Sequence, residues 1–140
     1  MRARLLCAAA LAATAAAPAW AASDPLQAAW EAASADREGS ITDQQFARLN
    51  VIAYHGAAAS LCEGLALDGV QVADAVNAIL QANPEGATAE ALVQRHVDIL
   101  VALGTARGLF LAEGSLHPDR FCASAKDARE APDFDDFWID

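Results

Sequence analysis

Hydrophobic residues recur every three or four positions along most of the chain, and no segment alternates apolar and polar residues as a half-buried strand does. Turn signals divide this pattern into five segments. The predicted helices are at about 24–34, 42–67, 70–82, 88–113 and 117–129. The sequence therefore predicts an all-α fold, a small bundle of about four to five helices.

Residues that cap helix N-termini stand at the predicted starts. Thr42 and Gln45 fit the capping box, in which each side chain accepts a hydrogen bond from the other residue's backbone. The other starts carry an N-cap residue or a proline suited to the first turn: Asp24, Asp68, Thr88 and Pro118.

The fourth predicted helix is the most apolar. We expect it to be the central helix, covered on most sides. Gly104 and Gly108 lie four residues apart on it, which would let a neighbouring backbone approach closely. Arg107 stands between them and needs either water or a carboxylate partner. Candidate partners are Glu63, Asp98 and Glu113. His96 is interpreted as a histidine of the core.

The first 21 residues have the pattern of an export signal. Arg2 and Arg4 precede an uncharged apolar run of about 13 residues, and Ala19-Trp20-Ala21 resembles a cleavage site. The run is too short for the roughly 20 residues of a spanning helix. We predict cleavage near Ala21, a single helical domain at 22–140 without a stable membrane span, and a periplasmic or secreted location.

Charge and cysteine content follow from this processing. The chain has 19 acidic and 9 basic side chains, and removing Arg2 and Arg4 leaves a formal charge of −12. Such a charge disfavours nucleic acid and favours basic partners. Cys7 is lost with the signal, so Cys62 and Cys122 remain. In an oxidising compartment they are predicted to form one disulfide that closes the bundle.

Residues 26–46 resemble an EF-hand, a helix–loop–helix unit with a twelve-residue calcium loop. The loop would span residues 34–45, with Gly39 at its sixth position and an aliphatic residue at its eighth. The resemblance implies calcium ligands at Ser34, Asp36, Glu38 and Gln45. Ser34 and Gln45 stand where the family has Asp and Glu, and an ordinary helix–turn–helix with a capping box explains the same pattern.

The C-terminal tail, residues 131–140, is acidic and aromatic. Phe134, Phe137 and Trp138 would share one side of a helical turn. They either pack on the protein's own core or bind the basic, apolar groove of a partner.

The sequence contains no recognisable catalytic or cofactor motif. The leading hypothesis is a non-enzymatic, exported protein that binds another protein, and a periplasmic chaperone is one form of it. The first alternative is a calcium-binding module at residues 34–45. The second is an enzyme with an unrecognised site, placed near Tyr54, His55 and Arg107.

Overall fold

The computed structural model describes residues 25–35, 41–130 and 137–139. This part of the chain holds five helices: α1 Pro25–Ala35, α2 Asp43–Leu61, α3 Gly69–Gln81, α4 Ala89–Leu116 and α5 Pro118–Arg129. Its β pairing is limited to an isolated antiparallel bridge between Leu67 and Trp138. The predicted all-α fold is confirmed.

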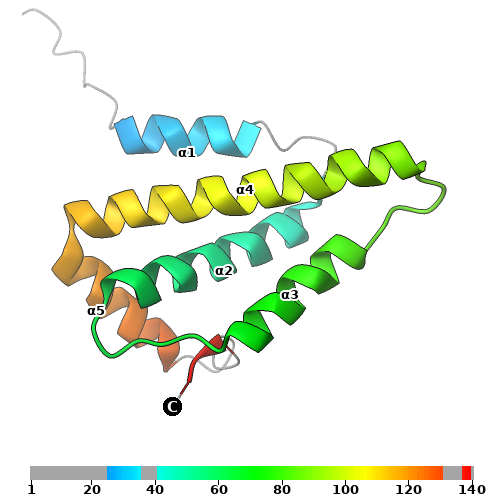
Figure 1. Ribbon diagram of the computed structural model, residues 1–140. Helices are drawn as coiled ribbons and strands as arrows, with labels where there is room; N and C mark the ends of the chain where they lie inside the picture. Colours follow the sequence, from blue (N-terminus) through cyan, green and yellow to red (C-terminus); the bar gives the residue numbers. More distant parts are fainter. Residues whose placement is uncertain (1–24, 36–40, 131–136, 140) are drawn as a thin grey trace, which may run out of the picture.

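Helices α2 and α4 form the centre of the arrangement, lying side by side and running in the same direction (Figure 1). α3 runs back in the opposite direction, inclined to α2, and its last turns come closest to the start of α2 (Figure 1). α1 lies on the other side of α4, and α5 packs at the end where α2 and α4 finish (Figure 1).

The predicted caps are present at the starts of three helices. The Thr42 hydroxyl accepts a hydrogen bond from the Gln45 backbone N–H at 3.2 Å, and the Gln45 side-chain oxygen accepts one from the Thr42 backbone N–H at 3.1 Å. Asp68 and Thr88 accept hydrogen bonds from the first turns of α3 and α4. Each cap satisfies backbone donors that a helix leaves open. Asp24 lies outside the described residues.

Helix α2 ends earlier than the sequence predicts. It stops at Leu61, because Cys62 has extended backbone angles and Gly64 has a φ of +81°, a conformation that favours glycine. Leu65, whose spacing suggested a longer helix, lies instead in the connection to α3 together with Leu67, and both pack into the core from there.

Two clusters of buried side chains make up the core, and α2 contributes to both. The first is centred on Leu49, Ile52, Ile79 and Ile99 and joins α2, α3 and α4. The second joins α2 to α5 and includes Ala57, Ala58, Cys62, Phe121 and Ala125. The small residues of α2 in the second cluster allow close approach of the aromatic ring from α5.

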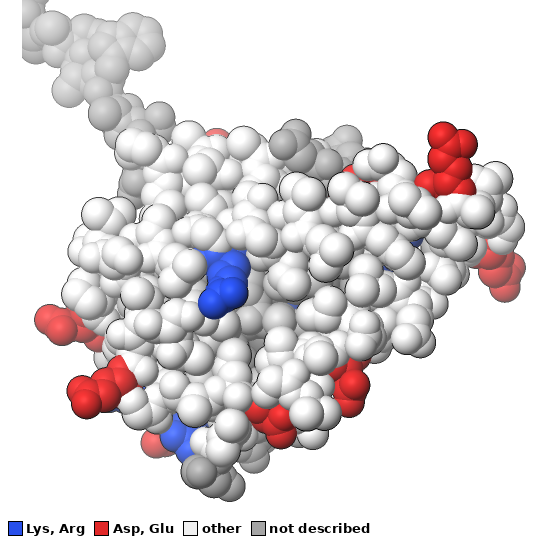
Figure 2. Space-filling model, viewed as in Figure 1, with Lys and Arg blue, Asp and Glu red and all other residues white. Residues whose placement is uncertain are grey.

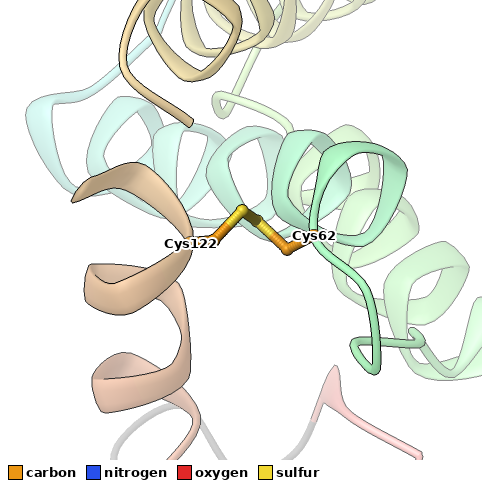
Figure 3. The surroundings of a disulfide bond; sticks show 2 residues. All are labelled: Cys62 and Cys122. Carbon is orange, nitrogen blue, oxygen red and sulfur yellow. A yellow bond between two sulfur atoms is a disulfide. The ribbon is translucent and has the colours of Figure 1, made fainter. Parts of the chain in front are cut away.

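The disulfide between Cys62 and Cys122 is present, with a Cα–Cα distance of 5.4 Å. It joins the end of α2 to α5 (Figure 3). The sequence separation is 60 residues. In the chain-entropy model, closing a loop of that size stabilises the folded state by about 4 kcal/mol. This is a large share of the stability expected for a small domain.

The end of the tail packs on the protein itself. The Phe137 carbonyl accepts a hydrogen bond from the Asp68 backbone N–H at 2.9 Å. Phe137 and Trp138 are 5% and 8% exposed. Of the two alternatives considered for the tail, packing on the protein's own core is what the structure shows for these two rings, and partner binding by the tail stays a prediction. Phe134 lies outside the described residues.

The expectation that α4 is covered on most sides is wrong. α4 has 28 residues against 19 in α2, so it extends beyond its neighbour (Figure 1). Ile99 and Ala106 face the core, while other large apolar residues of α4 remain exposed. The most buried helix is α2. A uniformly apolar composition does not reveal which side of a helix is left uncovered.

Arg95 is the buried arginine of α4, with 6% exposure. Its guanidinium donates hydrogen bonds to the backbone oxygens of Ile79 at 3.1 Å and Leu80 at 3.3 Å. These carbonyls end α3, where the helix leaves acceptors open and carries partial negative charge. Arg95 of α4 therefore caps the end of α3 and holds that end against α4.

Candidate functional site

One side of α4 presents a continuous apolar face to solvent. Val93, Val97, Leu100 and Val101 are 64%, 48%, 53% and 60% exposed. Their spacing of four, three and one residues places them together on the helix. A single exposed leucine is ordinary, but a contiguous patch of this kind on a monomer often marks a binding surface. We call these four residues the α4 face.

Charged residues are sparse over α4. Figure 2 shows the molecule with α4 across it, and the acidic side chains gather mostly toward the edges. Basic atoms are visible over α2, beside α4, within otherwise uncharged surface (Figure 2). The strong negative charge predicted from composition therefore surrounds an uncharged region in this view rather than covering it.

Between α2, α3 and α4 lies a groove of about 300 Å³. Its walls are mainly aliphatic, and the representative side chains are Ile52, Ala59, Val72 and Leu103. The polar side chains of its lining are Ser60 and Arg107. We call this space the Arg107 groove.

Arg107 is exposed and held over α2 rather than paired with an acid. Its guanidinium donates a hydrogen bond to the Ser60 hydroxyl at 3.2 Å. It forms no ion pair within the part of the chain that the structure describes. The carboxylates considered from the sequence, Glu63, Asp98 and Glu113, are therefore not its partners.

His55 is part of the core of α2, with 2% exposure. Its ring packs against Trp138, with centroids 4.8 Å apart, and against Phe137 at 5.7 Å. Burial disfavours the charged imidazolium and lowers the pKa of His55 from 6.5 to about 4. The ring is therefore neutral at physiological pH, and it fills space beneath the tail.

The structure does not assemble the enzyme site considered from the sequence. Tyr54 and His55 line a cavity of about 280 Å³ together with Phe110. Arg107 lies in the separate groove and is not among the residues of that cavity. His96, interpreted as a core histidine, is exposed and contacts the Leu80 carbonyl at 3.1 Å. The interpretation of His96 as a core histidine was wrong.

The candidate calcium loop is only partly within the described residues. Ser34 is exposed near the end of α1, and the Gln45 side chain is engaged in the capping box of α2. Asp36 and Glu38 lie outside the described residues. Within the described ranges, no three His, Cys, Asp or Glu side chains gather to hold a metal ion. Calcium binding stays a prediction.

One helix of the described chain, α4, is long and apolar enough to cross a membrane by length and composition alone. A core helix of a soluble protein satisfies the same criteria.

The chain matches no family model, and no curated protein or solved structure is detectably similar to it. Functional inference therefore depends on its own surfaces.

Sequence reasoning missed both surfaces, each for its own reason. Val97 and Leu100 lie on a helix with apolar residues on both its buried and its exposed side, so the pattern did not mark the side that stays exposed. The Arg107 groove depends on the inclination of α3 to α2, which is a tertiary property. Arg107, a charged residue in the most apolar predicted helix, was the available signal in the sequence for the groove.

Proposed function

We propose that the protein is exported and acts without catalysis, by binding apolar segments of other polypeptides on the α4 face. The observation that carries this proposal is the exposure of Val93, Val97, Leu100 and Val101 as one surface. Together they offer on the order of 300 Å² of apolar area, the size at which patches on monomers are often functional.

An unfolded or partly folded chain suits this surface as a partner. The face is a helix side whose backbone groups are already hydrogen-bonded, so it selects apolar side chains rather than an extended strand. The acidic side chains toward the edges favour basic residues next to the bound apolar segment (Figure 2). A chaperone-like role would follow from this preference.

Export is part of the proposal and has independent support. The disulfide between Cys62 and Cys122 fits an oxidising compartment, where such bonds persist. Signal cleavage near Ala21 would deliver residues 22–140 to the periplasm or the exterior. Mass spectrometry of the protein recovered from the cell envelope tests this step. The expected N-terminus is Ala22, and an intact Met1 would contradict it.

Binding can be tested with lysozyme that has been reduced and alkylated with iodoacetamide, which is unfolded and basic. Native lysozyme is the matched control, because it has the same basic side chains without the exposed apolar segments. Fluorescence anisotropy should detect binding of the labelled unfolded form and not of the native form. Alkylation beforehand avoids a reductant that would open the Cys62–Cys122 bond.

Two leucines of α4 make a matched pair of variants. Leu100 is 53% exposed within the face, and Leu116 is 66% exposed at the end of the helix. Leu100→Gln should weaken binding about fivefold, because roughly half a leucine side chain would no longer be buried in the complex. Leu116→Gln should bind as the original protein does. Equal binding of native and unfolded lysozyme, or equal effects of the two substitutions, would contradict the proposal.

A further inference from the structure

The Arg107 groove is a second surface, and its chemistry differs from that of the α4 face. It combines aliphatic walls from three helices with a cation held at its edge. Arg107 is exposed, so water reaches its guanidinium, and an anionic group of a ligand can replace that water. Within the described residues Arg107 has a hydroxyl and no carboxylate as its partner.

A short hydrogen-bond chain holds the arginine in place. The Ser60 hydroxyl donates to the Gly56 backbone oxygen at 2.8 Å, which leaves its oxygen free to accept from the Arg107 guanidinium. The side chain lies across α2 at Gly56, where an added Cβ would be 3.6 Å from Nε. A guanidinium has five donors, and this arrangement uses one of them. The others can meet an anion.

The side chains that line the groove determine which kind of anion it can bind. Ile52, Ala59, Val72 and Leu103 offer only aliphatic contact. The backbones of α2, α3 and α4 are hydrogen-bonded within their own helices, so they cannot pair with the backbone of a peptide. An aliphatic chain has no backbone groups that need hydrogen-bond partners. One guanidinium also matches one carboxylate, which it can bind through two parallel hydrogen bonds.

The geometry points to a binding site for a medium-chain aliphatic monocarboxylic acid, with its carboxylate on Arg107 and its hydrocarbon chain along the aliphatic walls of the groove. The volume of about 300 Å³ is at the lower end of small-molecule sites, which suits a chain of about eight carbons. The surrounding uncharged surface lets the chain leave water without burying other charges (Figure 2).

Calorimetric titration of the oxidised protein with octanoate tests the site, using hexanoate and octan-1-ol as comparison ligands. Octanoate should bind about tenfold more tightly than hexanoate, because each buried methylene strengthens binding by about threefold. Octan-1-ol should bind at least about tenfold more weakly than octanoate, since it lacks the charge that meets the guanidinium.

Arg107→Gln should weaken octanoate binding about tenfold and leave octan-1-ol binding unchanged. Arg120→Gln, at an exposed position of α5, removes the same charge elsewhere and should have no effect on either ligand. Circular dichroism confirms that both variants are folded. Absence of octanoate binding overturns the assignment. So does equal binding of acid and alcohol, independence of chain length, or an equal effect of the two arginine substitutions.

Discussion

A glycine-to-alanine comparison within α4 tests the packing of this helix. At Gly114 an added Cβ would lie 2.5 Å from the Leu61 Cδ1 atom and 2.9 Å from the Phe121 Cδ1 atom. Leu61 is 39% exposed and can rotate away, but the Phe121 ring is 5% exposed and fixed in the core. At Gly104 an added Cβ would meet nothing within 4 Å. The same substitution therefore has opposite surroundings at two positions of one helix.

The expected free energies follow from these surroundings. Replacing a helical glycine with alanine gains about 0.5–1 kcal/mol where space is open. Gly104→Ala should therefore stabilise the protein by that amount. At Gly114 the same gain is opposed by overpacking against Phe121, which costs about 1–3 kcal/mol. Because the helix term cancels in the comparison, Gly114→Ala should be about 1–3 kcal/mol less stable than Gly104→Ala.

Urea unfolding followed by far-ultraviolet circular dichroism measures both values, provided that each transition is two-state. Gly108→Ala is an additional control, since its added Cβ also meets nothing within 4 Å. It should behave like Gly104→Ala. If Gly114→Ala proves as stable as Gly104→Ala, then α4 and α5 do not pack at Gly114 as described, and the reasoning fails.

Three further predictions concern the same fold. Replacing Cys62 and Cys122 together with alanine should lower the free energy of unfolding by about 4 kcal/mol, and a loss under about 1 kcal/mol in urea unfolding would refute the loop-closure account. Burial lowers the pKa of His55 from 6.5 to about 4, so as the pH falls the unfolded state binds a proton at His55 before the folded state does. The contribution of His55 to the free energy of unfolding should therefore be intact above pH 6.5 and shrink by about 3 kcal/mol on reaching pH 4. A His55→Gln variant should lose this part of the pH dependence, and an unchanged pH profile would show that His55 is not its source. Arg95→Met should cost about 1–3 kcal/mol because the carbonyls at the end of α3 lose their donors, and proteolysis confined to α3 in the variant would identify where the fold opens.

Local chemistry made much of this fold predictable. Thr42, Asp68 and Thr88 are N-caps whose action depends only on the next few residues, so sequence alone located three helix starts. The disulfide was predictable for a different reason. The predicted loss of Cys7 with the signal left Cys62 and Cys122 as the two thiols to pair, and the structure confirms their bond.

Long-range geometry accounts for what the sequence did not reveal. Arg95 and Arg107 lie on one helix in similar apolar surroundings, yet Arg95 is the buried one because the end of α3 meets it there. Gly104 and Gly108 were expected to admit a neighbouring backbone, but the close approach occurs at Gly114. Phe137 packs inward because its backbone pairs with a connection about 70 residues away. Spacing along the chain contains none of this information.

Both proposed binding surfaces depend on such long-range geometry. The α4 face exists because no described helix covers the side of α4 opposite Ile99, and the Arg107 groove exists because α3 is inclined to α2 and begins away from it (Figure 1). The sequence favoured a protein-binding role from charge and the absence of catalytic motifs. The structure suggests different residues for that role, since it buries Phe137 and Trp138 of the tail.

Site-specific photocrosslinking tests the proposed role of the α4 face most directly. A benzophenone amino acid replaces Val97 in one variant and Leu116 in another, both at exposed positions of α4. After illumination with reduced, alkylated lysozyme, the account predicts a strong crosslink from position 97 and little from position 116. Native lysozyme should give little from either position. Equal crosslinking from both positions, or none from position 97, would contradict the claim that the α4 face binds apolar polypeptide.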